Sequence, residues 1–455
     1  MIDLRGRTLR ASFFHAPIRG EIEFFEDALV AVGDDGKIVR IVRQGDEGYD
    51  GAIGVSEDEE KLVTLPPGTF VLPGFVDLHI HAPQYPQLGE ALDVPLEVWL
   101  GKYTFPLEAQ YADLDFARPR YEALVGDLLA NGTTTALYFA TVHQAATRLL
   151  ADICLDKGQR ALVGKVVMDD PASCPDYYRD ASTTTAITDT RALIDYVRHH
   201  SANTDGLVLP VITPRFIPSC TDKALAGLGA LAAECDCHIQ THCSESDWAH
   251  GHALERYGKT DTEALDSFGL LTRRTVLAHS NFITDDDVDR IGSRGAGVAH
   301  CAVSNAYFAG AVFPLRAALE KGVKVGLGTD ISGGPSASMF DAARMAVMAS
   351  RMLETGVDPA LPALDRGRPD SRIDFATAFH LATAGGADVL DLPTGRFAPG
   401  CHFDAMVIDT TAETGGIRLF GERAPGDVLQ KLINTASRAN ISAVWVGGRQ
   451  VAGEG

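Results

Sequence analysis

Residues 72–81 read Leu-Pro-Gly-Phe-Val-Asp-Leu-His-Ile-His, and this stretch decides the fold. It is apolar and rich in β-branched and aromatic side chains, which predicts a buried strand. Side chains two residues apart on a strand point to the same face, so His79 and His81 are expected to point the same way. Two ordinary polar side chains can have this spacing by chance. Two imidazoles on one rigid strand also supply half of a zinc site, and the rest of the chain decides between these interpretations.

Outward from this stretch, short apolar β-type runs alternate with helix-compatible stretches. The predicted strands are 70–80, 133–139, 161–168, 207–212, 238–242, 275–279, 297–300 and 324–327. Predicted helices between them include 121–130, 224–233, 285–292 and 315–320. Eight alternating units of this kind predict an α/β fold, a (β/α)8 barrel of the TIM type.

Both ends of the chain have a different sequence pattern, with β-type runs and hairpin signals. The runs are 8–14, 22–25, 29–32, 38–42, 403–408 and 441–446. The turns Asp34-Asp35-Gly36 and Gly447-Gly448 are typical of hairpins. We therefore expect the two termini to form one small β-sandwich domain. The predicted division is 1–70 and 396–455 for the two parts of this domain and 71–395 for the catalytic barrel.

The composition excludes several classes of protein. The chain has 455 residues, of which 45% are hydrophobic, and a formal net charge of −21. This excess of acids disfavours nucleic acid and anionic membranes as partners. No apolar run reaches the ~18–20 residues that span a bilayer, and the start Met1-Ile2-Asp3-Leu4-Arg5 does not resemble a signal peptide. We expect a cytoplasmic protein with a small-molecule substrate and with its eight cysteines reduced.

Further candidate metal ligands follow other predicted strands. His242 and His279 each close a predicted strand, and Asp330 follows another after two residues, Gly328 and Thr329. The carboxyl ends of barrel strands meet on one face, where active sites are found. Imidazoles and a carboxylate brought together there suit zinc, and also non-haem divalent iron. The sequence therefore predicts a metal centre at the mouth of the barrel.

Glu245 lies three residues after the candidate ligand His242. A carboxylate beside a metal-activated water is the usual proton shuttle, which makes Glu245 the candidate general acid and base. The alternative is an acid in the first turn of a helix, where the helix dipole favours it.

A long excursion follows the first predicted barrel strand. Residues 81–109 contain four prolines together with Trp99, Tyr103 and Phe105. At this end of a barrel such a segment is placed to roof the pocket. The alternative is an ordered surface loop held by its own aromatic packing.

Taken together, these motifs resemble the single-metal branch of the amidohydrolase superfamily. The resemblance rests on Pro-Gly-x-x-Asp-x-His-x-His at 73–81, on the histidines of the fifth and sixth strands and on Gly-Thr-Asp at 328–330. A narrower set of strings resembles the guanine deaminases, at 79–85, 99–106, 138–141, 213–216, 238–245 and 326–334. One departure is Ala302, where the family often has proline, and it weakens the assignment of the substrate slightly.

The resemblance implies a role for each candidate residue. One zinc ion per subunit, or alternatively iron, would be held by His79, His81, His242 and Asp330. Glu245, Asp330 and His279 would be catalytic, with His279 orienting the attacking water, and Gln84, Arg215 and Phe216 would bind the purine. Arginine offers a planar fork of donors and phenylalanine a flat apolar face, which agrees with these roles. The alternative for Arg215 is a structural ion pair at a strand end.

The expected reaction is the zinc-dependent hydrolytic deamination of guanine to xanthine and ammonia, by a homodimer of the kind usual for such enzymes. A deaminase of another ring on the same scaffold remains an alternative, acting on 8-oxoguanine, a pterin such as isoxanthopterin, or a triazine. A more remote alternative is a non-catalytic binding protein that has kept the barrel. Such a protein is free to lose a ligand or the acid, whereas this sequence has every one of them.

Overall fold

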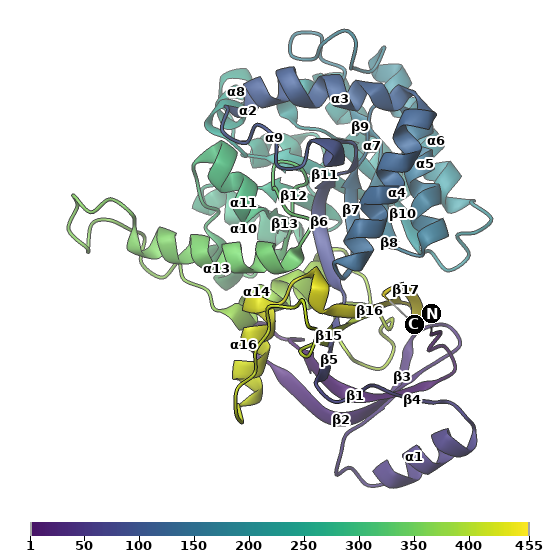
Figure 1. The fold of residues 1–455 in the computed structure, drawn as a ribbon. Coiled ribbons are helices and arrows are strands. Elements are labelled where there is room, and N and C mark those ends of the chain that lie inside the picture. The colour runs from purple at the N-terminus through teal and green to yellow at the C-terminus, as the bar shows by residue number, and fades with distance from the viewer. Residues whose placement is uncertain (1, 454–455) are drawn as a thin grey trace.

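The computed structural model describes residues 2–453 and consists of a barrel stacked on a smaller β-domain (Figure 1). Eight parallel strands form the barrel in the order β14-β13-β12-β11-β10-β8-β7-β6. Their bounds are β6 Phe75–His81, β7 Thr133–Phe139, β8 Arg160–Gly164, β10 Val208–Pro214, β11 His238–Cys243, β12 Thr275–His279, β13 Gly297–His300 and β14 Lys324–Leu327. A short strand, β9 (Val166–Val167), also pairs with β10.

The barrel closes where the segment after β14 meets β6. The Asp330 amide donates to the His79 carbonyl at 2.8 Å, and the His81 amide donates to the Ile331 carbonyl at 2.8 Å. This closure confirms the predicted (β/α)8 architecture. It also places the end of the last strand directly beside the paired histidines of the first.

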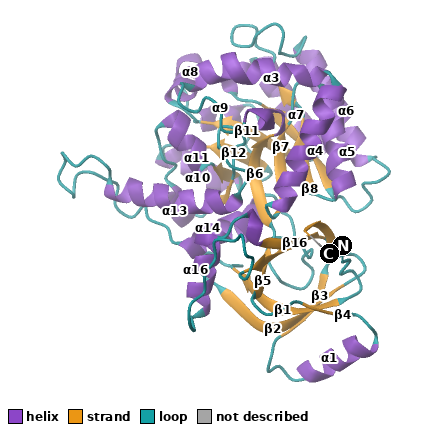
Figure 2. Cartoon of the chain, viewed as in Figure 1, coloured by secondary structure: helices purple, strands orange, loops and turns teal. Residues whose placement is uncertain are grey.

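Helices surround the barrel strands (Figure 2). The longer ones are α4 Leu114–Ala130, α5 Gln144–Lys157, α6 Thr183–Arg198, α7 Asp222–Cys235, α8 Asp247–Tyr257, α9 Asp261–Ser267, α10 Asp285–Arg294, α12 Leu315–Glu320, α13 Met339–Thr355 and α14 Phe375–His380. Shorter segments are η4 Ile217–Ser219, α11 Ala302–Ser304, η5 Asn305–Ala309, η6 Leu381–Gly385 and α15 Gly386–Val389. Polar caps begin several of these helices. For example, Thr284 and Asp287 form a capping box at the start of α10, as the Thr-Asp-Asp-Asp sequence favours.

The excursion after β6 is folded rather than open. It contains η1 (Ala82–Gln87), α2 (Leu96–Trp99), η2 (Leu100–Thr104) and α3 (Phe105–Ala109), and η3 (Gln110–Ala112) follows it. Leu96, Trp99, Leu100 and Phe105 are buried in one hydrophobic cluster with Phe139 at the end of β7. The excursion is thus anchored on the mouth of the barrel.

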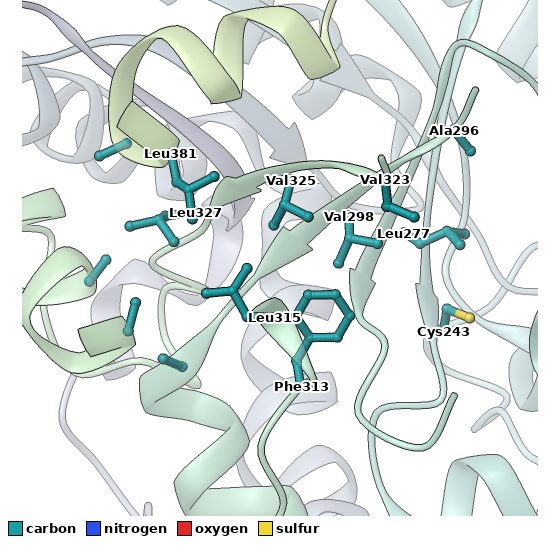
Figure 3. Packing of buried hydrophobic residues seen from close by; sticks show 14 of the residues in the cluster. Cys243, Leu277, Ala296, Val298, Phe313, Leu315, Val323, Val325, Leu327 and Leu381 are labelled. Atoms are coloured by element: carbon teal, nitrogen blue, oxygen red, sulfur yellow. The ribbon is translucent and has the colours of Figure 1, made fainter. Parts of the chain in front are cut away.

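The largest hydrophobic cluster fills the space between the barrel strands and their helices. Figure 3 shows part of it, where Leu277, Val298, Val325 and Leu327 project from β12, β13 and β14 toward Phe313 and neighbouring side chains. Burial of each such side chain contributes ~1.5–3 kcal/mol, so this packing is a main source of the rigidity of the strands. Rigid strands in turn fix the side chains at their ends.

Both termini build the smaller domain, as predicted. Its strands are β1 Thr8–His15, β2 Glu23–Val32, β3 Ile38–Val42, β4 Leu62–Thr64, β5 Thr69–Pro73, β15 Ala405–Asp409, β16 Ile441–Val446 and β17 Arg449–Gly453. They run in the order β17-β16-β15-β5-β1-β2-β3, with β4 also paired to β1. The domain carries α1 (Tyr49–Asp58), and α16 (Pro425–Thr435) and η7 (Arg438–Asn440) lie between β15 and β16. The two chain ends lie close together beside β17 (Figure 1).

The prediction of one strand over 70–80 is wrong in one respect. The run contains two strands, β5 in the small sheet and β6 in the barrel, separated by Gly74. At Gly74 the chain passes so close to β7 that an added Cβ would lie 2.1 Å from Thr134 Oγ1. Glycine is therefore required there, and it marks the point where the chain leaves one sheet and enters the other.

The predicted runs 22–25 and 29–32 likewise form a single strand, β2. The pairing of β2 with β1 shifts register between Ala11 and Phe13, and Asp27 has a φ of 43°. An irregularity of this kind interrupts the alternation of side chains, which is why the sequence pattern predicts two runs instead of one. Within residues 2–453, no helix combines the length and the apolar character that a bilayer crossing requires.

Candidate active site

The candidate metal ligands meet at the carboxyl end of the barrel strands. His79 and His81 lie at the end of β6, His242 near the end of β11, and Asp330 three residues after β14. His279 closes β12 beside them. All five side chains are buried, none more than 7% exposed. The fold therefore brings together residues that are up to 251 positions apart in sequence, from His79 to Asp330.

The side-chain nitrogen and oxygen atoms of these residues lie close to one another. The Nε2 atoms of His81 and His242 are 3.0 Å apart. Asp330 Oδ1 lies 3.2 Å from His79 Nε2 and 3.7 Å from His81 Nε2. Donor atoms of His79, His81 and Asp330 all lie within 4.8 Å of one another, as do those of His79, His242 and His279.

This donor set fits a single divalent metal ion. Tetrahedral ligands at 2.0–2.1 Å from zinc are separated by about 3.3 Å, and the three distances above bracket that value. Nε2 of His79, which lies 3.2 Å from Asp330 Oδ1, is buried without a hydrogen-bond partner in residues 2–453. Buried polar atoms without partners are rare in proteins, and a cation bound at its lone pair would account for this one.

Electrostatics favours the ligand form of these histidines. Burial lowers the pKa of His79, His81 and His242 well below the ordinary histidine value, and the neighbouring imidazoles lower it further. A neutral imidazole has a lone pair for a metal, whereas a protonated one does not. The rings are thus neutral across the physiological range.

Neighbouring groups orient the imidazole rings. Nδ1 of His242 donates to the Arg215 carbonyl at 2.6 Å, so its Nε2 carries the lone pair that faces the site. Nδ1 of His279 donates in the same way to Asn305 Oδ1 at 2.9 Å.

The buried Asp77 connects β6 to the segment after β14. It accepts hydrogen bonds from the Thr329 amide at 3.0 Å, from the Thr329 hydroxyl at 2.5 Å and from the His79 amide at 3.2 Å. Burial raises the pKa of Asp77 to about 7.

The backbone turns sharply at the strand ends that carry the site. Ser244, His279, Ser280 and Asp330 have φ values of 47°, 71°, 55° and 51°, in the left-handed region that residues other than glycine rarely adopt. Each such residue costs ~1–3 kcal/mol and persists only where its surroundings hold it. Three of the strand ends that build the site therefore store strain, a feature that is common in active sites.

Glu245 lies at the edge of the cluster of candidate metal ligands, two residues before helix α8. Helix α8 begins at Asp247 with Ser246 as its cap, and Asn281 Nδ2 holds the Glu245 carbonyl at 2.8 Å. Glu245 Oε1 is 3.6 Å from His279 Nε2. Burial, and then the nearby Asp330, raise the pKa of Glu245 to about 8. A carboxyl group with a pKa near neutrality is suited to both taking and giving a proton.

A small pocket with a cavity volume of about 20 Å³ opens onto this cluster. Its lining includes Gln84, Arg215 and Phe216, the three residues predicted to bind substrate, together with Glu245 and Asp330. Leu96, Trp99 and Leu100 of the excursion form another wall, and the Trp99 ring lies 5.1 Å from that of Phe308. The segment that sequence analysis placed over the pocket thus lines it.

The sequence reasoning missed the partner of Arg215. The carboxylate of Glu108, on α3, accepts Arg215 Nη1 at 2.7 Å and Nη2 at 3.1 Å. The Tyr178 hydroxyl donates to the same carboxylate at 2.6 Å. The two interpretations of Arg215, purine contact and structural ion pair, are therefore compatible in one geometry. Glu108 follows the aromatic stretch 99–106 as a single acid, and nothing in the sequence around it indicates that it pairs with Arg215.

Fold and site together define a metal-dependent hydrolase with its active site at the mouth of a (β/α)8 barrel. Residues 70–451 match the model of the amidohydrolase family. A probable guanine deaminase of Schizosaccharomyces pombe is 40% identical over 400 residues, which are 87% of this chain and 74% of that protein. The guanine deaminase of Homo sapiens is 37% identical over 97% of this chain and 96% of its own.

Solved structures agree with these relatives. A guanine deaminase from C. acetobutylicum with guanine bound in its active site superimposes with a TM-score of 0.86, at 29% identity, over 98% of this chain and 99% of that one. The guanine deaminase of E. coli has a TM-score of 0.84 at 28% identity, over 99% and 100% of the two chains. This chain belongs to the amidohydrolase family and, within it, to the guanine deaminases.

Proposed function

We propose that this protein catalyses the hydrolytic deamination of guanine, in which guanine and water give xanthine and ammonia. The observation that carries the proposal is the pocket itself, where Arg215, Gln84 and Phe216 face the same small space as Glu245. Its support from relatives is the 37% identity to human guanine deaminase along nearly the whole chain.

We propose His79, His81, His242 and Asp330 as the ligands of one metal ion per subunit. Zinc is the metal that this set of imidazoles and one carboxylate suits best, and divalent iron is the alternative. A bound divalent ion would act as a Lewis acid and lower the pKa of a water molecule toward ~7.

Arg215 and Phe216 would position the ring of the substrate. Guanine offers two adjacent acceptors, the oxygen on its six-membered ring and the neighbouring nitrogen of its five-membered ring. The Nε–H and the second N–H of Nη2, the donors of Arg215 that Glu108 does not use, match this pair. Phe216 offers the face of its ring, 6.0 Å from the His242 ring, as a surface for stacking. Gln84 would read a further edge of the ring. The carbon that carries the amine is then directed toward Glu245.

Glu245 would carry protons during the reaction. Attack of water on the amine-bearing carbon requires that a proton leave the water and reach the adjacent ring nitrogen. Glu245 can take the first proton and deliver it, since burial of its carboxyl group favours the protonated form. His279, with its Nδ1 held by Asn305, and Asp330 would orient the attacking water. Protonation of the departing amine by Glu245 or Asp330 completes the release of ammonia.

The test is ammonia release by purified, zinc-loaded protein with guanine, 8-oxoguanine, adenine, cytosine, pterin and isoxanthopterin as substrates. We expect guanine to have the highest kcat/KM. Preference for 8-oxoguanine or a pterin would contradict the substrate and leave the metal chemistry in place. Absence of ammonia release from the whole panel would contradict the deaminase activity itself.

We also propose that the protein is a cytoplasmic homodimer, as the family resemblance suggests, and that the chain divides near residues 70 and 395. Light scattering on the eluting peak of a sizing column tests the dimer, where a mass of one chain, 48.6 kDa, would refute it. Limited proteolysis tests the division, since cleavage is expected in exposed segments between domains.

A further inference from the structure

We infer that Glu108 is the positioning residue of the substrate pocket: it fixes Arg215 in the orientation that reads the ring oxygen of the substrate, and it fixes Gln84 beside it. This inference rests on the proposed function. It assigns a role to a residue that does not line the pocket and that contacts no reacting atom.

The carboxylate of Glu108 is completely buried and accepts four hydrogen bonds. Oε1 accepts Gln84 Nε2 at 2.8 Å and Arg215 Nη2 at 3.1 Å, and Oε2 accepts Arg215 Nη1 at 2.7 Å and the Tyr178 hydroxyl at 2.6 Å. A carboxylate has about four lone-pair sites, so this one is saturated. Glu108 has no acceptor left for a substrate, and any influence on binding passes through its partners.

Those partners are two of the residues proposed to bind the purine. One N–H of Gln84 points at Glu108 while Gln84 Oε1 accepts the Ser332 amide at 3.1 Å, which determines which end of the amide is the donor. Arg215 donates one N–H from each terminal nitrogen to Glu108. The guanidinium plane is thereby fixed. Nη1 also donates to Met168 Sδ at 3.6 Å, so the Nε–H and the second N–H of Nη2 are the donors left for the pocket that Arg215 lines.

Two residues of the short helix α3 contact Arg215. Phe105 and Glu108 are three residues apart, so they share one face of the helix. The Arg215 guanidinium carbon lies 5.1 Å from the centre of the Phe105 ring, within the range of a cation–π contact. The excursion therefore provides an electrostatic and an aromatic contact to the same side chain, in addition to the walls formed by α2 and η2.

Stability alone is a weak explanation for this ion pair. Arg215 and Glu108 are 2% and 0% exposed, and burying two charges costs desolvation that their attraction often fails to exceed. The pair does keep Arg215 charged: burial acts to lower its pKa, and the Glu108 carboxylate more than offsets this, so the pKa of Arg215 is raised. It also cancels the charge of the fork, so the pocket reads a neutral ring by hydrogen bonds instead of attracting anions.

The test compares guanine with 2-aminopurine, which has the same amine-bearing carbon and lacks the ring oxygen. We expect Glu108→Gln to raise KM for guanine at least 10-fold, with a smaller change in kcat and in the kcat/KM for 2-aminopurine. If 2-aminopurine is turned over too slowly, its inhibition constant against guanine replaces kcat/KM. Glu97→Gln, an exposed carboxylate of the same excursion, is the matched control and is expected to behave as the unaltered protein.

Further variants keep the inference testable if Glu108→Gln does not fold. Tyr178→Phe removes one of the four donors and retains the ion pair, and we expect it to raise KM for guanine about 3-fold with kcat unchanged. Glu108→Asp retains the charge and is expected to recover part of the preference for guanine. Equal losses for guanine and 2-aminopurine in the folded variants would overturn the inference. Failure of the unaltered protein to deaminate guanine would instead overturn the proposed function.

Discussion

Replacing Glu245 by glutamine should change how the stability of the metal-free protein depends on pH. The structure raises the pKa of this carboxyl group from 4.5 to about 8, through burial and then the proximity of Asp330. A pKa difference of about 3.5 corresponds to roughly 5 kcal/mol, at 1.36 kcal/mol per unit. Because the folded state holds the proton more tightly, this stability is fully present below pH 4.5 and is lost as the pH rises through 8.

The measurement is denaturant unfolding of metal-free protein, followed by tryptophan fluorescence from pH 5 to pH 9. Over this interval the Glu245 carboxyl group should lower the free energy of unfolding by about 4 kcal/mol in the unaltered protein. Glutamine does not titrate. The unfolding free energy of Glu245→Gln should therefore fall less between pH 5 and pH 9 than that of the unaltered protein. Metal-free protein is essential because a bound cation favours the ionised carboxylate.

Glu255→Gln is the control, since Glu255 is exposed on α8, the helix that follows Glu245. Its unfolding free energy should follow that of the unaltered protein at every pH. If the curves of Glu245→Gln and the unaltered protein run parallel within about 1 kcal/mol, Glu245 has no raised pKa. The argument that it shuttles protons at neutral pH would then lose its physical basis.

Three further outcomes are expected. His81→Ala should lower zinc content after dialysis from one ion per chain to well below half, measured by elemental analysis, because it removes one of four ligands; unchanged content would contradict the ligand assignment. In the zinc-loaded protein, Glu245→Gln should lower kcat by ~10²–10⁴-fold with little change in KM, by steady-state ammonia release, and near-normal turnover would rule out its role. Gly74→Ala should destabilise the fold by ~1–3 kcal/mol, since its Cβ would meet Thr134 Oγ1 at 2.1 Å, whereas Gly101→Ala, with no atom within 4 Å, serves as the control in denaturant unfolding.

The sequence predicts the barrel, and the meeting of the candidate ligands at its mouth, because both depend on short-range patterns. His79 and His81 share a strand face by their spacing alone, and His242 and His279 each end an apolar run. Once eight such runs imply a closed barrel, their carboxyl ends must meet. The position of each ligand therefore follows from the architecture, without knowledge of any particular contact.

The rest of the site depends on contacts that no local pattern reveals. Glu108 and Arg215 are 107 residues apart, and neither the composition nor the periodicity of α3 distinguishes this acid from an exposed one. The break at Gly74 was equally hidden, since the strands on its two sides are both apolar and differ only in the sheet they join. Predictions from sequence fail here because the deciding atoms, such as Thr134 Oγ1, come from elsewhere in the chain.

A bound cation would change the ionisation of the acidic groups at the barrel mouth. Burial raises the pKa of Glu245 and of Asp330, while the imidazoles are held neutral. The only nearby cationic side chain among the pocket residues, Arg215, is already paired with Glu108. A divalent ion among these groups would favour the ionised form of Asp330 and supply a partner for Nε2 of His79. One bound cation would thus satisfy His79 Nε2 and offset the effect of burial on the two carboxyl groups, which Arg215 cannot do because it is already paired with Glu108.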